Sequence, residues 1–176
     1  NVNNESTLLG GAGNVINNLK ALGAIVDVIS VIGDCDASIQ LRELLKTIEV
    51  DTKYIFLQKN RILSKKSRII AAQQQVIRFD REDVEEISVD SQKKILNAFK
   101  SLIKDYDVVL LSDYGKGVLT KELTKSLVNI AKKNSKKVLI DPKGIDYSKY
   151  KGAHLLTPNK QEASEATRLA IKDDQS

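Results

Sequence analysis

The hydrophobic pattern predicts helices and strands that alternate along most of the chain. The β-branched run 25–32 ends at Gly33 and is typical of a buried strand. Apolar positions recur at helical spacing after Asp36, which can cap a helix over residues 38–48. From residue 91 the rhythm repeats, with helices expected over 92–104, from Thr120 to Lys133 and from near Lys160, and strands over 107–112, 137–141 and 154–157. This alternation implies an α/β fold, a mostly parallel sheet with helices on both faces.

A different pattern separates the two helical regions. Residues 52–57, 67–72 and 75–79 alternate between apolar and polar positions, as half-exposed strands do. We expect an inserted β lid over about residues 52–81, outside the main sheet. A turn at Gln73-Gln74 would join its last two strands, pair Ala72 with Gln75, and set Arg78 across from Ile69 with Arg68 diagonally adjacent.

A glycine-rich turn, Gly10-Gly11-Ala12-Gly13-Asn14, precedes a helix predicted over residues 15–22. Glycines let the backbone approach a ligand closely, and the Asn14 amide can both donate to and accept from a hydroxyl. The turn therefore indicates a small-molecule site with sugar hydroxyls as partners. A dinucleotide-binding turn is disfavoured, because its third glycine position falls on Ile16 and the preceding residues are polar. A turn that only packs a helix on a sheet is the remaining alternative.

Composition narrows the class of protein. The 176 residues suffice for one domain or most of one, and 41% hydrophobic with 29% charged residues is typical of a globular protein. A net charge of +5 with only 5% aromatic residues gives little support to nucleic-acid binding. No apolar run approaches membrane-spanning length, and the single cysteine excludes an internal disulfide. We therefore expect a cytoplasmic protein with neither a nucleic-acid nor a membrane partner.

Polar clusters follow three consecutive predicted strands, at residues 112–117, 141–144 and 157–162. Ligands of such folds gather at the carboxyl ends of parallel strands. Lys143 beside Gly144 suits a phosphate, and Asn159 with Glu162 can hold hydrated Mg²⁺ through water. Each cluster also has a structural alternative: Asp113 can form a turn, Asp141-Pro142 can start one, and Asn159 with Glu162 can form a capping box. Together the three clusters favour phosphoryl transfer.

These motifs resemble those of the ribokinase-like (pfkB) carbohydrate kinases. The glycine turn with Gly23 and Gly33 matches the family's N-terminal signature, apart from Ile16, where a small residue is usual. The run from Asn159 to Glu162 matches its Asn-x-x-Glu motif for Mg²⁺ and nucleotide phosphates. Segments 74–80, 111–117, 140–144 and 155–159 are most similar to the members that phosphorylate heptose 7-phosphate. The resemblance is collinear over essentially the whole chain.

The resemblance implies ATP- and Mg²⁺-dependent phosphorylation of the anomeric hydroxyl of D-glycero-β-D-manno-heptose 7-phosphate, for ADP-heptose and lipopolysaccharide core synthesis. The implied substrate-binding residues are Gly10, Gly11, Asn14, Arg68, Gln74, Arg78, Asp80 and Asp113. The implied ATP-binding residues are Lys143, Asn159, Lys160, Gln161 and Glu162, of which Asn159 and Glu162 hold the metal through water. For Arg68 and Arg78 the expected role is to grip the 7-phosphate, and a charged strand edge is the alternative.

The resemblance also implies missing parts. The family has a βα unit before the matched region and, after it, a Gly-Ala-Gly-Asp turn that supplies the catalytic base, so we expect this segment alone to be inactive. A homodimer through the β lid and a fused nucleotidyltransferase domain are expected partners. A kinase for another sugar or nucleoside, or a non-catalytic sugar- or nucleotide-binding module, remains the alternative.

Overall fold

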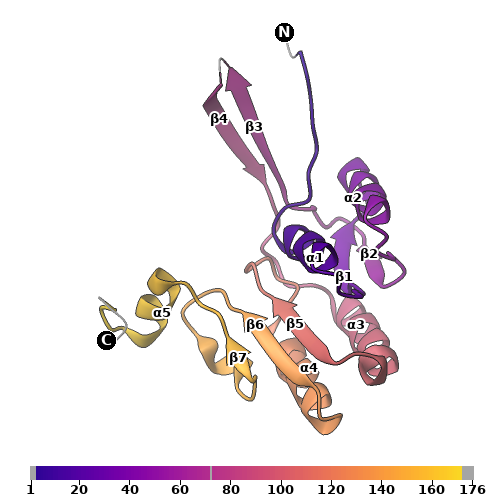
Figure 1. The fold of residues 1–176 in the computed structure, drawn as a ribbon, viewed down its shortest axis with the longest axis vertical. Coiled ribbons are helices and arrows are strands. Elements are labelled where there is room, and N and C mark those ends of the chain that lie inside the picture. Colours follow the sequence, from indigo (N-terminus) through magenta and orange to yellow (C-terminus); the bar gives the residue numbers. More distant parts are fainter. Residues whose placement is uncertain (1–2, 72, 172–176) are drawn as a thin grey trace. The chain divides into compact units, whose positions relative to one another are not determined.

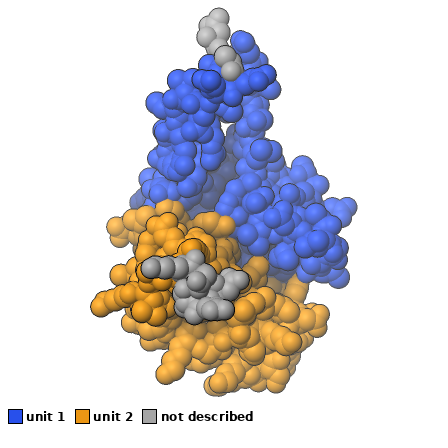
Figure 2. Space-filling model, turned by 60° about the vertical axis from the view of Figure 1, so that its left-hand side comes forward, with its two compact units in different colours: residues 1–83 blue, residues 84–176 orange. Residues whose placement is uncertain are grey.

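The computed structural model describes residues 3–71 and 73–171 and divides into two compact units, residues 1–83 and 84–176 (Figures 1 and 2). The first unit contains α1 (Ala12–Ala21), β1 (Ser30–Gly33), α2 (Asp36–Thr47), β2 (Ile55–Gln58), β3 (Lys65–Ala71) and β4 (Gln74–Arg81). The second contains α3 (Val89–Leu102), the 3₁₀ helix η1 (Ile103–Asp105), β5 (Val108–Ser112), α4 (Lys121–Lys133), β6 (Lys137–Asp141), η2 (Tyr147–Tyr150), β7 (Leu155–Leu156) and α5 (Lys160–Thr167).

The first unit is built on a parallel pair of strands, β1 and β2, with Ser30 opposite Ile55. Its buried core cluster consists of Ile32, Leu45, Val50 and Ile55. Ile16, the departure from the family's glycine signature, packs against this cluster from α1. A large apolar residue at that position therefore serves helix packing.

Three sequence predictions for this unit are wrong. The first helix begins at Ala12 instead of residue 15, so Gly13 and Asn14 lie inside its first turn. The strand expected over residues 25–32 is confined to β1, and Ile25 is 88% exposed. Ile55–Gln58, expected in the lid, instead pairs in parallel with β1. Apolar periodicity cannot distinguish a strand from an extended loop that crosses the surface, which explains the second error.

β3 and β4 form the expected antiparallel hairpin (Figure 1), but their residue pairing differs from the predicted one. Ala71 pairs with Gln74, and Arg68 lies directly opposite Arg78 instead of diagonal to it. Gln73 takes a positive φ of 65° at the turn, while Ala72, for which a pairing was predicted, lies outside the described residues. A register shift between Ile69 and Ile70 accompanies the difference, and such a bulge is not visible in a sequence pattern.

The second unit is a three-stranded parallel sheet in the order β5-β6-β7. Helix α3 packs against α4, and α4 packs against β6 and η2. The predicted strand 137–141 and the helix from Thr120 to Lys133 are confirmed, and the Thr120 side chain accepts a hydrogen bond from the Leu123 amide at 3.2 Å. The α/β class with parallel sheets is confirmed. Among the described residues, none of the helices combines the length and apolar character needed to cross a membrane.

Candidate functional site

The three polar clusters of the second unit meet at one edge of its sheet. Ser112 pairs with Asp141 and Ile140 with Leu156, so β5, β6 and β7 end side by side. The loops that follow these strands carry Asp113, Lys143 and the start of α5. The structure thus brings together the predicted nucleotide-binding residues, as expected for the carboxyl edge of a parallel sheet.

The start of α5 is closed by a complete capping box. Asn159 Oδ1 accepts a hydrogen bond from the Glu162 amide at 2.9 Å, and Glu162 Oε2 accepts one from the Asn159 amide at 3.0 Å. The remaining oxygen, Glu162 Oε1, lies 2.8 Å from Lys143 Nζ. Lys160 is the first residue of the helix, and the side-chain amide of Gln161 donates from Nε2 to Glu165 Oε1 on the next turn. The capping alternative is therefore present, and it leaves Glu162 charged and facing Lys143.

Electrostatics couple three groups at this edge. The hydrogen bond from Lys143 lowers the pKa of Glu162, and the same contact raises the pKa of Lys143. Burial, and after it the negative charge of Glu162, raises the pKa of Asp141. Two carboxylates that disfavour each other's charge are suited to a divalent cation, and Mg²⁺ is commonly held by one or two carboxylates, waters and substrate phosphates.

The donor set therefore fits a hydrated Mg²⁺ bound together with a nucleotide. Within residues 3–71 and 73–171, no three His, Cys, Asp or Glu side chains gather as a metal-binding group. A site of this composition depends on phosphate oxygens and water for the remaining ligands.

Asp113 lies at the centre of a buried network that the sequence did not reveal. Its Oδ2 atom accepts from Lys149 Nζ at 2.6 Å and from the Tyr150 hydroxyl at 2.7 Å, and its Oδ1 accepts from the Gly115 amide at 2.8 Å. The hydrogen bond from the Gly115 amide closes the turn that the sequence predicts at Asp113. Lys149 and Tyr150 stand in a short 3₁₀ helix without hydrophobic periodicity, so no sequence pattern marks them.

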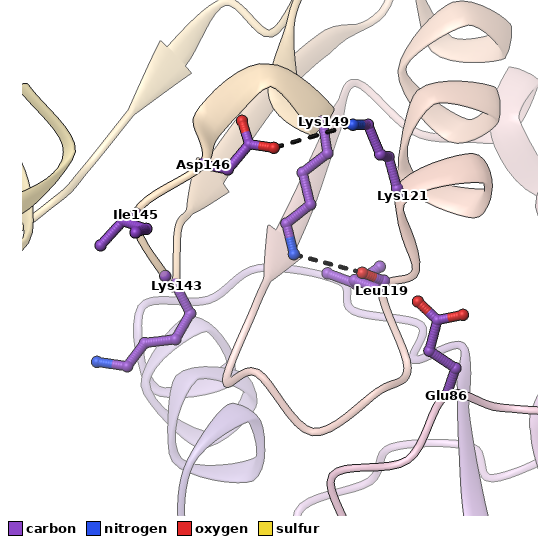
Figure 3. Close-up of a pocket in the computed structure, with 8 residues that line it drawn as sticks. Glu86, Leu119, Lys121, Lys143, Ile145, Asp146 and Lys149 are labelled. Atoms are coloured by element: carbon purple, nitrogen blue, oxygen red, sulfur yellow. Dashed lines mark hydrogen bonds and ion pairs between the residues drawn. The ribbon is translucent and has the colours of Figure 1, made fainter.

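A pocket of about 350 Å³ adjoins this network (Figure 3). Its lining residues come from the loop before α3, the loop before α4 and the start of that helix, the segment between β6 and η2, and η2 itself: Glu86, Leu119, Lys121, Lys143, Gly144, Ile145, Asp146 and Lys149. Lys149 extends across the pocket toward Leu119, and Lys121 pairs with Asp146 at 3.9 Å. The exposed Lys121–Asp146 pair thus lines the pocket, and Lys149 connects the pocket to the buried Asp113.

The remaining predicted substrate residues lie in the first unit. Gly10 and Gly11 accept backbone hydrogen bonds from the start of α1, and Asn14 is exposed in its first turn. Gln74 begins β4. Arg78 donates to Asp80 on its own strand, from Nε at 2.9 Å and from Nη2 at 2.6 Å. Their contacts with substrate stay predictions.

The Arg78–Asp80 pair changes the chemistry expected of the hairpin. The Arg78 hydrogen bonds lower the pKa of Asp80 from 3.8 to about 2. Lys66 Nζ also lies 3.6 Å from Asp80. The described hairpin therefore balances part of its own positive charge.

Comparison with known proteins shows the family. A model described as pfkB family carbohydrate kinase matches residues 1–176. Bifunctional protein HldE of Aliarcobacter butzleri (strain RM4018) is 57% identical over 176 residues, which are 100% of this chain and 37% of that protein. Bifunctional protein HldE of Sulfurimonas denitrificans (strain ATCC 33889 / DSM 1251) is 55% identical over 175 residues, 99% of this chain and again 37% of that protein. The chain thus spans little more than a third of these relatives.

Solved structures show the same fold at low sequence identity. The structure of Arabidopsis thaliana ribokinase complexed with ribose and ATP has a TM-score of 0.69 at 16% identity, covering 94% of this chain and 54% of that one. The crystal structure of Sa239 has a TM-score of 0.71 at 18% identity, covering 99% and 60%. Together with the family match over its whole length, these findings show that the chain belongs to the pfkB family of carbohydrate kinases.

Proposed function

We propose that this chain is part of an ATP- and Mg²⁺-dependent kinase that phosphorylates the anomeric hydroxyl of D-glycero-β-D-manno-heptose 7-phosphate. The product, the 1,7-bisphosphate, would serve ADP-heptose and lipopolysaccharide core synthesis. The observation that carries the proposal is the Lys143–Glu162 pair beside Asp141 at the carboxyl edge of the sheet, in a chain of the pfkB family. The resemblance of segments 74–80 and 111–117 to heptose 7-phosphate kinases supports the choice of sugar.

The nucleotide side of the reaction is assigned to the second unit. Bound Mg²⁺–ATP would supply the phosphoryl group and screen its charge. Lys143 would neutralise phosphate oxygens, and Glu162 and Asn159 would hold the hydrated metal, with Lys160 and Gln161 along the same turn. Lys143 already faces a carboxylate, so it must exchange one anionic partner for another.

The sugar side is assigned to the first unit. Gly10, Gly11 and Asn14 would contact hydroxyl groups, and Arg68 and Arg78 the 7-phosphate, because a guanidinium can bind phosphate through two hydrogen bonds. The base that deprotonates the anomeric hydroxyl is expected outside these residues. We therefore also propose that residues 1–176 alone show no turnover, since losing a general base typically costs about 10²–10⁴-fold.

A substrate panel tests the proposed function. The complete protein that contains this chain is assayed for ADP release with heptose 7-phosphate, unphosphorylated heptose, ribose and a nucleoside, with and without Mg²⁺. We expect Mg²⁺-dependent turnover with a preference for heptose 7-phosphate, and ³¹P NMR should show a new anomeric phosphate. Turnover only with another sugar or a nucleoside would replace the proposed substrate, and binding without turnover on any of them would favour a non-catalytic module.

The hairpin supports a proposal about assembly. One face of the β3–β4 ribbon carries Ile69, Ile77 and Phe79, because Ile69 pairs with Ile77 and side chains two positions apart share a face. Each of these three side chains is at least half exposed. Arg68 and Arg78 lie on the other face. We propose that the apolar face joins two copies into a homodimer in the cytoplasm. Sedimentation of an Ile77→Ser/Phe79→Ser variant should show a monomer, and an unchanged dimer would contradict the proposal.

The relatives named above are called bifunctional, and this chain covers 37% of their length. A nucleotidyltransferase domain in the same polypeptide is therefore part of the proposal. Sequencing outward from both ends tests it directly.

A further inference from the structure

The network around Asp113 joins the loops that follow β5 and β6. The Asp113 side chain is 4% exposed and that of its partner Lys149 is 20% exposed. The Lys149 ammonium also lies 5.0 Å from the centroid of the Tyr150 ring. Its contact with the Leu119 carbonyl oxygen, at 3.5 Å, is drawn in Figure 3. One carboxylate thus ties η2 to the loop before α4.

Tyr150 carries this connection to the backbone of Lys143. Its hydroxyl oxygen accepts a hydrogen bond from the Lys143 amide at 3.0 Å and donates to Asp113 Oδ2 at 2.7 Å. The residue is 2% exposed, and burial raises the pKa of Tyr150 well above its ordinary value. The hydroxyl therefore keeps its proton and donates it in the hydrogen bond to the carboxylate, while a lone pair of its oxygen accepts from the Lys143 amide.

The position of Lys143 needs such a support. The next residue, Gly144, has φ +89° and nothing within 4 Å of the place where a Cβ would be, so local sterics do not fix the turn. Lys143 is itself exposed, and its ammonium nevertheless meets Glu162 Oε1 at 2.8 Å. Its backbone, held by Tyr150, determines where the ammonium can reach.

We infer that Tyr150 is a positioning residue, which Asp113 and Lys149 anchor and which sets the backbone of Lys143 for contact with nucleotide phosphates. The inference rests on the proposed function, because that function assigns Lys143 to the nucleotide. Asp113 acts here as an anchor through Tyr150. The role concerns nucleotide affinity, so the sugar and the chemical step are not affected directly.

Tyr150→Phe tests the inference, with Tyr147→Phe as the matched control. Tyr147 stands in the same 3₁₀ helix and packs edge to face on Tyr150, with ring centroids 5.6 Å apart. Its buried hydroxyl has no hydrogen-bond partner among the residues that the structure describes. Both variants remove one buried hydroxyl, but only Tyr150→Phe removes the support of Lys143.

In the complete protein we expect Tyr150→Phe to raise KM for ATP and Kd for the ATP analogue AMP-PNP about tenfold, the factor that loss of one buried hydrogen bond produces. KM for the sugar should stay unchanged and kcat should fall by less than about threefold, because the bound nucleotide loses the same interaction in the ground state and in the transition state. Tyr147→Phe should resemble the wild type. Hydrogen exchange of the Lys143 amide should become faster in Tyr150→Phe alone, while amides of β6 keep their protection.

Two results would overturn the inference. One is a lower melting temperature with KM for ATP equal to that of Tyr147→Phe, which would make Tyr150 a structural residue only. The other is unchanged exchange at Lys143. If the wild-type protein phosphorylates no sugar, the proposed function fails instead, and the exchange and AMP-PNP measurements still decide whether Tyr150 positions Lys143.

Discussion

Replacing Asp113 by Asn should destabilise the second unit far more than its single lost charge suggests. The change keeps the shape of the side chain and an acceptor for the Gly115 amide. It removes the negative charge that faces Lys149 at 2.6 Å and Tyr150 at 2.7 Å. An amide nitrogen placed there would set a donor against the Lys149 ammonium.

The magnitude follows from burial. Breaking a buried ion pair by removing one partner costs about 3–5 kcal/mol, because the other charge stays desolvated. Lys149 retains some exposure, so we expect a loss near the lower end, about 3 kcal/mol. Whole domains are stable by only about 5–15 kcal/mol, so the variant should lose a large share of the unit's stability.

The pocket beside this network supplies the control. Asp146 pairs with Lys121 at 3.9 Å, and these side chains are 66% and 50% exposed. Asp146→Asn keeps the acceptor for the Ser148 amide and should leave stability almost unchanged, because water and salt screen an exposed pair. Both variants change one aspartate beside one lysine, so burial is the main difference between them.

Native-state hydrogen exchange of β5 and β6 amides in the complete protein measures the loss for this unit, without assuming two-state unfolding of the whole molecule. Adding Lys149→Met to Asp113→Asn should recover part of the loss, because it removes the stranded charge. Equal costs for Asp113→Asn and Asp146→Asn would refute the reasoning, and so would a double variant no more stable than Asp113→Asn.

Glu162→Gln keeps the capping acceptor but loses the charge, so the melting temperature should stay nearly constant while kcat falls and a higher Mg²⁺ concentration is needed. Normal kinetics with a lower melting temperature would show that Glu162 only caps the helix. Lys143 holds the pKa of Glu162 below its ordinary 4.5, so the small stabilisation by this ion pair should be complete above pH 4.5 and disappear as the pH falls through the lowered pKa. Melting curves of the Glu162→Gln variant should lack this pH dependence. Arg78→Ala should raise KM for heptose 7-phosphate more than KM for ATP, and an equal loss with unphosphorylated heptose would leave Arg78 as a charged strand edge. Gly117→Ala should lower the melting temperature by several degrees, because its Cβ would lie 1.9 Å from the Glu85 carbonyl oxygen; an unchanged value would contradict that packing.

The sequence determined the order of elements wherever local rules decide it. Strand 137–141 and the helix capped by Thr120 follow from apolar periodicity and a single hydroxyl, both of which act within a few residues. The capping box of α5 was open to the same reasoning, since Asn159 and Glu162 stand three residues apart. That three polar loops share one edge also follows from the pattern, because parallel strands must end side by side.

Tertiary structure decided what depends on pairing and on contacts between distant residues. The bulge at Ile69 changed the hairpin register and set Arg68 opposite Arg78, which no alternation pattern could fix. The bonds from Asp113 to Lys149 and Tyr150 join residues more than thirty positions apart. Burial makes that contact strong, and only packing in the folded chain removes water from the carboxylate. In the sequence alone, Asp113 cannot be distinguished from an ordinary turn residue.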